Sequence, residues 1–432
     1  MKNRKALALI AILALVAAAC GGSDGGSDEA VVEVETTEAP ATTEAPTTTA
    51  APAPASDPLI LASLMPLSGD LASLGPGIAL GAALAVEQIN AAGGINGQPV
   101  VLIEGDSGCD GAVALTSLND VIAQGAQGVM GAACSSTSLA ILDTAIAAEV
   151  VMISPSNTSP QFTKIDKKGF YARTAPSDLL QGDVLASLLV EDGVQTVSII
   201  SRADSYGRGL AEATAAAFEA AGGTVKTIVY HATDASEFTS EVTAVGKGGA
   251  DAIVGILFPE TGCGVLQPAF EQGLLDTPWY MTDGVKDAGL ASLCGLGTAL
   301  DGFKGTAPGS AAGEAKDAFE AAYAEVSADG SPTFIFAPQA YDAVMLMAIS
   351  AAANGVTGPE IASGLVAASS GGEKCIGVAC IALAADGVDV DYVGASGEIE
   401  LNAVGDPTAA TYDIWTTEGD TNPVLKSVDF GS

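Results

Sequence analysis

Short apolar runs alternate with longer periodic stretches along most of the chain. The run "LILASLMP" (59–66) precedes "GPGIALGAALAVEQINAAGG" (75–94), in which apolar residues recur with helical spacing and glycine stands at both ends. The run "PVVLIEGD" (99–106) then precedes a second such stretch, residues 111–125. Short, continuously apolar strands separated by helices are typical of a parallel sheet that is covered on both faces.

The alternation restarts near residue 178, which predicts a second lobe. The further apolar runs, which we predict as strands, are 126–133, 150–156, 196–201, 225–230, 251–258 and 278–284. The further helical stretches are 135–149, 178–193, 207–223, 237–249, 264–275, 312–330 and 338–355. Because roughly 375 residues exceed what one hydrophobic core usually organises, we predict an α/β fold with two doubly wound parallel-sheet lobes.

Polar turns follow several of the predicted strands. Each is rich in small polar or charged residues, and they occupy residues 134–138, 154–160, 202–209, 259–262 and 282–287. In open parallel sheets, ligands bind beyond the carboxyl ends of the strands, where helix N-termini offer free N–H groups. Any one of these turns could serve only to cap its helix. Their distribution over both lobes favours a binding cleft between the lobes.

The N-terminal region does not follow this pattern. Residues 1–20 comprise a basic start, an apolar run too short to span a bilayer, and "AAAC" ending at Cys20. This arrangement resembles a bacterial lipoprotein signal; a plain secretory signal that leaves Cys20 free is the alternative. Residues 21–57 are rich in Thr, Ala, Pro and Glu, which predicts a disordered tether. We expect an exported protein that Cys20 anchors to the outer face of the cytoplasmic membrane.

The charge balance excludes one class of partner. The chain has a net charge of −36 and only 16 Lys and Arg residues, so little could neutralise phosphates, and we expect no nucleic-acid partner. We interpret the acidity as that of a soluble, self-repelling surface rather than as a site for a specific cationic partner.

The cysteines predict disulfides. Seven cysteines, less the lipidation cysteine, leave an even number in an oxidising compartment. Cys375 and Cys380 are close enough in sequence to close a small loop. The other four are Cys109, Cys134, Cys263 and Cys294. They allow three pairings, and we predict Cys109–Cys134 and Cys263–Cys294 because each pair would join neighbouring βα units.

Catalytic motifs are absent from the sequence. His231 is the only histidine, and no triad surrounds it. We find no nucleophile elbow, no phosphate-binding loop of Walker type and no Cys/His cluster with zinc spacing. The carboxylates of "DGVDVD" (386–391) lack the spacing of a calcium loop. We expect no catalysis, no cofactor and no metal.

The polar turns, in their order, resemble those of the periplasmic leucine/isoleucine/valine-binding protein family, the substrate-binding proteins of branched-chain amino acid ABC transporters. The most specific stretches are "NAAGGINGQPV" (90–100) and "ISPSNTSP" (153–160). Further matches are "PLSGDLASLGPG", "GAACSSTS", "YARTAPSDLLQG", "SYGRGLA", "FPETG", "MTDGV" and "YVGASGEIELNAVGDP". Together they cover nearly all of residues 58–415.

The resemblance implies a type I periplasmic-binding-protein fold, in which a three-strand hinge joins two lobes. We expect an N-terminal lobe of residues 58–176 and 306–402 and a C-terminal lobe of residues 177–305 and 403–432. The family also carries a disulfide between the "DSGCD" and "CSSTS" positions, which supports the first of the two pairings predicted above.

The resemblance also implies a ligand site. Ser135 would bind the ligand carboxylate with its hydroxyl, beside N–H groups of the turn that includes Ser136. The Ser156 carbonyl would accept from the ligand ammonium, and the Thr158 hydroxyl and N–H would contact the ligand's charged ends. Asp283 occupies the position of the family's acidic residue that pairs with the ammonium. This division suits a zwitterion, whose carboxylate needs donors and whose ammonium needs acceptors.

Other positions bear on the ligand's identity. Tyr206 and Phe258 match the family's cleft aromatics. Leu74 stands where the family often has an aromatic residue, which suggests a roomier pocket. Asn157 adds a polar group where a small apolar residue is common. We therefore expect an α-amino acid, branched-chain or related, or a related amide.

The expected function is that of a monomeric extracytoplasmic solute-binding lipoprotein that delivers its ligand to the permease of an ABC transporter. The alternative is a receptor of the same fold that signals to a membrane kinase or chemoreceptor. A purely structural lobe pair is disfavoured by the polar turns.

Overall fold

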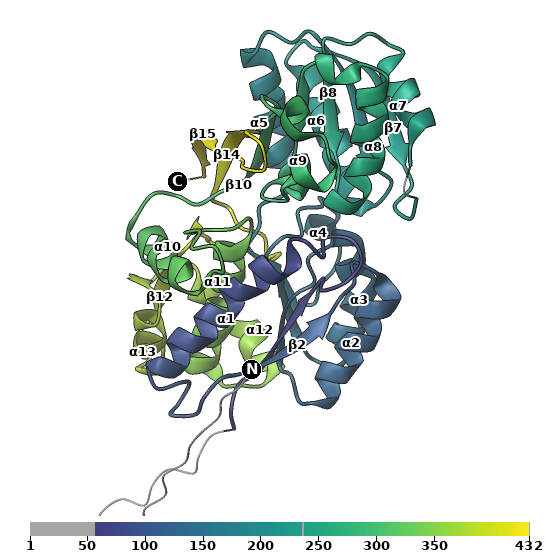
Figure 1. Cartoon of the computed structure of the whole chain (residues 1–432). Helices are drawn as coiled ribbons and strands as arrows, with labels where there is room; N and C mark the ends of the chain where they lie inside the picture. The colour runs from purple at the N-terminus through teal and green to yellow at the C-terminus, as the bar shows by residue number, and fades with distance from the viewer. Residues whose placement is uncertain (1–56, 236, 432) are drawn as a thin grey trace, which may run out of the picture. The chain divides into compact units, whose positions relative to one another are not determined.

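The computed structural model describes residues 57–235 and 237–431, and its backbone forms two lobes (Figure 1). The predicted signal peptide, residues 1–20 with Cys20, lies outside the described residues, as does the predicted tether of residues 21–57 apart from Asp57. Among the helices of the described residues, none is long and apolar enough to cross a membrane.

The first lobe is built on a parallel sheet of five strands in the order β2-β1-β3-β4-β5. The strands are β1 (Ile60–Met65), β2 (Val101–Asp106), β3 (Gly128–Gly131), β4 (Val151–Ser154) and β5 (Tyr171–Arg173). The helices that follow them in sequence are α1 (Gly75–Ala91), α2 (Gly111–Ala123), α3 (Ser135–Ala147) and α4 (Gln161–Lys164). Later in the chain, the lobe gains α10 (Glu314–Val326), α11 (Ala337–Asn354), α12 (Gly358–Ala368) and α13 (Ala379–Ala385).

Both faces of this sheet are covered. On β1, Ala62 and Leu64 pack into a core formed with α2 and α3. Leu61 and Met65, which point to the other face, belong to the larger core that contains residues of α1 and α11. Burial on both faces explains why the strand is apolar at every position except Ser63 instead of alternating, as its sequence predicted.

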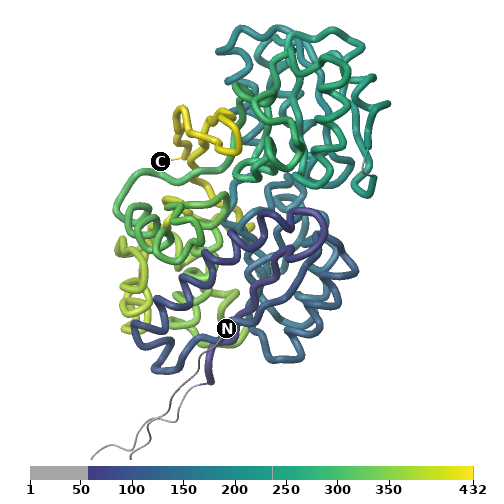
Figure 2. The backbone as a smooth tube through the Cα atoms, viewed as in Figure 1, coloured from purple at the N-terminus to yellow at the C-terminus, as the bar shows by residue number. Residues whose placement is uncertain are grey.

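The second lobe is built on a sheet of seven strands in the order β15-β14-β10-β9-β8-β6-β7. The strands are β6 (Thr196–Arg202), β7 (Thr224–His231), β8 (Ala252–Ile256), β9 (Trp279–Met281), β10 (Lys304–Pro308), β14 (Ala410–Thr416) and β15 (Val424–Phe430). The first five are parallel, whereas β14 and β15 run antiparallel to their neighbours (Figure 2, yellow). The helices are α5 (Asp178–Glu191), α6 (Ser205–Ala220), α7 (Thr239–Gly246), α8 (Pro259–Glu271) and α9 (Leu290–Leu293), with 3-10 turns η1 (Leu274–Asp276), η2 (Asp283–Val285) and η3 (Gly297–Leu300).

The chain passes between the two lobes three times, before α5, after β10 and between β13 and β14. A small sheet of β11 (Glu373–Ile376), β12 (Val390–Gly394) and β13 (Gly397–Glu398) packs against α13 and α11. The predicted fold class, two doubly wound lobes joined by three connecting segments, is therefore confirmed.

Among the parallel strands of the two large sheets, β5 and β10 were not predicted from the apolar pattern. β5 has three residues and contains Arg173, which is 0% exposed. The Arg173 guanidinium donates to Asp406 (3.0 Å) and to the carbonyl oxygens of Asn157 and Ser159 (3.0 Å each). A buried cation is tolerable only with such partners, and a local pattern does not reveal a partner 233 residues away.

Candidate functional site

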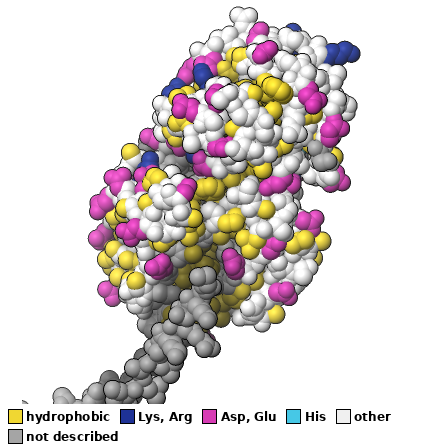
Figure 3. Space-filling view, in the orientation of Figure 1, with side chains coloured by type: hydrophobic (Ala, Val, Ile, Leu, Met, Phe, Trp, Pro, Cys, Tyr) yellow, Lys and Arg dark blue, Asp and Glu magenta, His cyan; other side chains and the backbone are white. Residues whose placement is uncertain are grey.

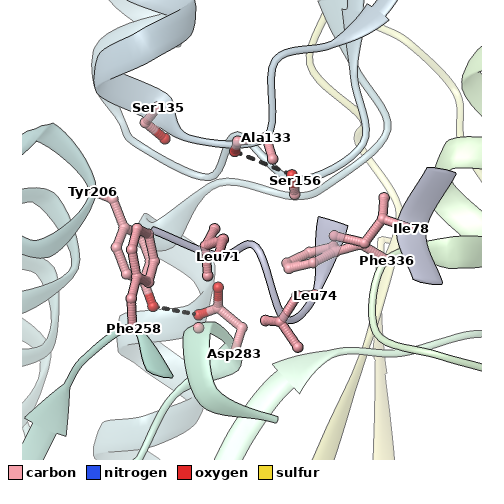
Figure 4. Close-up of a pocket in the computed structure, with 11 residues that line it drawn as sticks. Leu71, Leu74, Ile78, Ala133, Ser135, Ser156, Tyr206, Phe258, Asp283 and Phe336 are labelled. Atoms are coloured by element: carbon pink, nitrogen blue, oxygen red, sulfur yellow. Dashed lines mark hydrogen bonds between the residues drawn. The ribbon is translucent and has the colours of Figure 1, made fainter. Parts of the chain in front are cut away.

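A pocket lies where the two lobes meet, beyond the carboxyl ends of the parallel strands. The space within it, including the part open to solvent, is about 350 Å³ (Figure 4). The first lobe contributes Leu71, Leu74, Ile78, Ala133, Ser135, Ser156 and Phe336, and the second contributes Tyr206, Phe258, Asp283 and Gly284. Six residues singled out in the sequence thus surround one cavity: Leu74, Ser135, Ser156, Tyr206, Phe258 and Asp283.

One side of the pocket is a helix N-terminus. Ser135 is the first residue of α3, where backbone N–H groups have no partner within the helix. Cys134 precedes it in an extended conformation, and its disulfide fixes the chain at this point. The Ser135 hydroxyl accepts a long hydrogen bond from the Ser159 N–H (3.4 Å), and the Ser156 hydroxyl donates to the Ala133 carbonyl (3.1 Å). The N–H groups at this helix N-terminus and the Ser135 hydroxyl are donors that suit a carboxylate.

Asp283 lies across the pocket from this helix, on the turn after β9 (Figure 4). Its side chain is 3% exposed, and its Oδ1 accepts from the Tyr206 hydroxyl (2.9 Å) and from Gln181 Nε2 (2.8 Å). Burial raises the pKa of Asp283 to about 6, although the hydrogen bonds from Gln181 and Tyr206 lower it. None of the ion pairs between described residues includes Asp283. At neutral pH this carboxylate is therefore available to a cationic group of a ligand.

Two aromatic rings flank Asp283. Tyr206 and Phe258 are stacked with their centroids 5.3 Å apart, and the Arg202 guanidinium lies 3.9 Å from the Phe258 centroid. Gly284 permits this packing, because a Cβ there would lie 2.9 Å from Phe258 Cδ1 and 2.5 Å from the Leu257 carbonyl oxygen. The aromatic side of the pocket is thus tightly packed and stabilised by a cation–π contact.

The rest of the lining is an apolar wall, by which we mean Leu71, Leu74, Ile78 and Phe336. Leu71 and Leu74 lie in the turn between β1 and α1, Ile78 lies on α1, and Phe336 directly precedes α11. Of the four residues of this wall, only Leu74 was singled out from the sequence, and Leu71, Ile78 and Phe336 were missed. Leu71 and Ile78 flank it in the sequence, but nothing local indicates that Phe336, from a segment over 250 residues later, completes the same wall.

Three residues that the sequence singled out do not line the pocket. Ser136 is the half-buried second residue of α3. The Asn157 amide donates to the carbonyl oxygens of Ala132 (3.0 Å) and Ala133 (2.7 Å) and accepts from the Tyr171 hydroxyl (2.8 Å), so its polar atoms hold β3, β4 and β5 together.

The third of these residues, Thr158, is 0% exposed. Its carbonyl accepts from the N–H of Asp178 (2.8 Å), which joins the turn after β4 to the start of α5. Its side chain lies against the Asp178 carboxyl group.

An ion pair joins the lobes beside the pocket. Arg202, at the end of β6, donates to Asp70 of the first lobe (2.8 Å) and to Asp204 (2.9 Å). It also donates to the Thr261 hydroxyl (3.0 Å). Because Arg202 also lies over Phe258, the contact between the lobes and the aromatic side of the pocket share one residue.

The predicted disulfides are confirmed. Cys109–Cys134 joins the turn after β2 to the start of α3, and Cys263–Cys294 joins α8 to the end of α9. Cys375–Cys380 closes the small loop between β11 and α13.

Two α/β lobes with a polar and apolar pocket at their strand ends define a solute-binding protein. The chain belongs to the periplasmic binding protein family, whose model matches residues 58–374. The resemblance found in the sequence is thereby confirmed, and so is the expectation of an exported binding protein rather than an enzyme.

Individual relatives and solved structures agree with this family assignment. The leucine-, isoleucine-, valine-, threonine-, and alanine-binding protein of Pseudomonas aeruginosa is 30% identical over 304 residues, covering 68% of this chain and 78% of that protein. The chain spans 62% of the length of other curated relatives. The branched-chain amino acid transporter substrate binding protein LivJ of Streptococcus pneumoniae, solved with isoleucine, gives a TM-score of 0.72 at 22% identity, covering 87% and 100% of the two chains. An ABC transporter solute binding protein of R. palustris, solved with benzoate, gives 0.71 at 18%, covering 87% and 98%. At these identities the two structures show the shared fold.

Proposed function

We propose that the protein captures an α-amino acid with an apolar side chain between its lobes and delivers it to the permease of an ABC transporter. The observation that carries this proposal is the buried Asp283 carboxylate, which has only neutral donors and lies across the pocket from the N-terminus of α3. An α-amino acid supplies both complements, an ammonium for Asp283 and a carboxylate for Ser135. The amino acids named for the relatives support this ligand class.

The residues that line the pocket indicate the remaining contacts with the ligand. The carbonyl of Ser156 would accept from the ammonium, and the apolar wall would cover the side chain. Charge-assisted hydrogen bonds contribute about 1.5–3 kcal/mol each, and micromolar affinity corresponds to about 8 kcal/mol. A few such bonds and a buried aliphatic side chain are therefore sufficient.

A benzoate-like ligand is disfavoured by Asp283. The R. palustris neighbour shows that the fold also accommodates an aromatic carboxylate. Benzoate has no cationic group, so its entry would either leave the buried Asp283 charge without a cationic partner or require Asp283 to bind a proton.

A thermal-shift series tests the ligand class. Its ligands are leucine, alanine, leucinamide, 4-methylpentanoate and benzoate, of which the last two lack the ammonium and leucinamide lacks the carboxylate. Leucine at 100 times its dissociation constant should stabilise the protein by about 2.7 kcal/mol, whereas the three analogues should have little effect. Stabilisation by benzoate or 4-methylpentanoate but not by leucine would overturn the proposal.

The variant Asp283→Asn tests the ammonium contact in the same series. Removing the charge while keeping the side chain's shape should weaken leucine binding at least tenfold, or about 1.4 kcal/mol, by isothermal titration calorimetry. Asp276→Asn, at an exposed position of the same lobe, is the matched control. Equal affinities in the two variants would remove Asp283 from the site.

We propose further that Cys20 is lipidated and that residues 21–57 tether the two lobes to the membrane, as their composition indicates. A tethered binding protein remains within reach of a permease in the same membrane. The transporters named for the structural neighbours support an ABC permease as the partner.

A further inference from the structure

Two residues of the apolar wall have a backbone conformation that is unfavourable for their side chains. Leu71 has φ of +62° and Phe336 has φ of +61°. Positive φ is uncommon outside glycine, asparagine and aspartate, and for bulky residues it persists only where the surrounding structure holds it. Both residues belong to the first lobe and both face the ligand pocket.

A carboxylate of the second lobe holds the first of these residues. The Leu71 N–H donates to Glu260 Oε2 (2.8 Å), and the nearby Ser73 hydroxyl donates to Glu260 Oε1 (3.2 Å). Glu260 is in the first turn of α8, two residues after Phe258 of the pocket. The start of the same turn is held by a hydrogen bond within the first lobe, in which the Leu67 N–H donates to Asp106 (2.9 Å).

A second carboxylate of that lobe holds the segment before α11. The Ile335 N–H, directly before Phe336, donates to Asp287 Oδ2 (2.9 Å). Asp287 is itself fixed, because its N–H donates to Asn422 Oδ1 (2.9 Å) and its carboxylate lies 3.4 Å from Lys286 Nζ. It follows Asp283 by four residues, on the turn after β9.

The two contacts have the same design. In each, a carboxylate close in sequence to a pocket residue of the second lobe accepts from a backbone N–H of the first lobe. That N–H belongs to the positive-φ residue Leu71 itself in one contact and to Ile335, directly before Phe336, in the other. Each bond crosses between the lobes, so each exists only while the lobes are together. Hydrogen bonds to an ionised acceptor are about twice as strong as neutral ones, which suits them to hold an unfavourable conformation.

We propose that Glu260 and Asp287 are positioning residues that shape the apolar wall as the lobes close, so that selectivity for the ligand's side chain depends on closure. The inference rests on the proposed function, and neither carboxylate touches the ligand. In the proposed binding mode a long aliphatic side chain would contact the apolar wall, whereas the methyl group of alanine would be too short to do so. Closure that assembles a site in this way is a recognised route to specificity.

The test compares leucine and alanine binding to full-length wild type, Glu260→Ala and Asp287→Ala by isothermal titration calorimetry. Each variant should lower the ratio of leucine to alanine affinity at least about fivefold, because only leucine uses the wall. Glu260→Gln keeps an acceptor oxygen and should restore most of the ratio. Glu271→Ala on α8 and Asp276→Ala, both exposed, match the loss of charge and should leave the ratio unchanged.

A loss of affinity that is equal for leucine and alanine would show a general structural role and overturn the inference. A wild type that binds neither amino acid would contradict the proposed function instead. The inference is then tested by amide hydrogen exchange at Leu71 and Ile335 in the presence of the solute that stabilises the wild type in the thermal-shift series, because both bonds require the lobes to be together. Exchange should be faster at Leu71 in Glu260→Ala and at Ile335 in Asp287→Ala than in the charge-matched controls, and equal rates would overturn the inference.

Discussion

Asp178, the first residue of α5, is a carboxylic acid in an environment that disfavours its charge. It is 0% exposed, and neither carboxyl oxygen makes a hydrogen bond with a described residue. Burial raises its pKa well above the ordinary value, the charge of Asp283 raises it further, and the neighbouring Thr158 hydroxyl and Arg173 oppose this only in part. The unfolded chain therefore loses this proton at lower pH than the folded chain does.

This difference between the pKa of Asp178 in the folded and the unfolded chain determines how stability changes with pH. As pH rises from about 4 through the raised folded pKa, Asp178 increasingly favours the unfolded state, so its contribution to stability falls. Asp178→Asn cannot ionise and should raise the free energy of unfolding by about 1–3 kcal/mol at pH 8, with little change at pH 4. Urea denaturation at the two pH values measures this, with exposed Asp183→Asn on the same helix as the control. A gain that is equal at both pH values would contradict the assignment to ionisation.

Individual residues also show how much of the candidate site could be predicted from the sequence. The turns that contain Ser135 and Asp283 could be placed at the pocket because each follows a predicted strand, and the resemblance to the family singled out these two residues. Asn157 occupies a comparable turn, yet its amide bonds to the carbonyls of Ala132 and Ala133. Which way a polar side chain turns depends on the acceptors that the fold brings near it, and the sequence does not list those acceptors. Phe336 was missed because its segment is distant in the sequence from the other residues of the apolar wall.

At the scale of elements, the strands with uniform apolar character were predicted and the exceptions were not. β1, β2, β3 and β4 follow the predicted runs. In β1, β3 and β4, burial on both faces leaves a continuous apolar signal, whereas β2 is an edge strand and is partly exposed. β5 carries Arg173, whose charge is satisfied by Asp406, and β10 begins with Lys304, which pairs with Asp192 (2.6 Å). Each strand contains a charged residue whose partner is distant in the sequence, and hydrophobic periodicity does not reveal such a partner.

The disulfides give a prediction at the same scale. Cys263–Cys294 spans 31 residues and Cys375–Cys380 spans 5. Loop-closure entropy makes the first worth about 3.7 kcal/mol and the second about 2 kcal/mol. Replacing each pair with alanine should therefore lower the free energy of unfolding in that order in urea denaturation. Equal losses would show that contacts of the sulfur atoms, rather than the constraint on the unfolded chain, set the effect.

For the whole molecule, the two lobes followed from chain length and the restart of the pattern, but the contacts between them did not. The Arg202 guanidinium lies 2.8 Å from the Asp70 carboxylate, although the two residues are 132 positions apart in the sequence. No property of either local sequence indicates this pair. The lobes meet through such polar contacts, which can form and break as a ligand enters, and through a pocket to which both contribute.

The net charge of −36 sets the balance of forces across the molecule. On the face in Figure 3, Asp and Glu side chains are more widespread than Lys and Arg side chains, in line with this net charge. Self-repulsion of this kind destabilises a compact state, and salt screens it, since the Debye length falls from about 30 Å at 0.01 M to about 8 Å at 0.15 M. The same salt also weakens the exposed ion pairs, but these contribute little individually.

Repulsion should therefore dominate, and the melting temperature of the ligand-free protein should rise by about 3 °C or more between 0.01 M and 0.15 M sodium chloride. Differential scanning calorimetry measures the shift, and choline chloride, which screens equally, should reproduce it if sodium does not bind specifically. The shift should shrink near pH 4, where many carboxylates are protonated and the repulsion is weaker. A melting temperature that falls with salt would mean that ion pairs such as Arg202–Asp70 outweigh the repulsion, and the stability of the closed lobes would then depend mainly on those pairs.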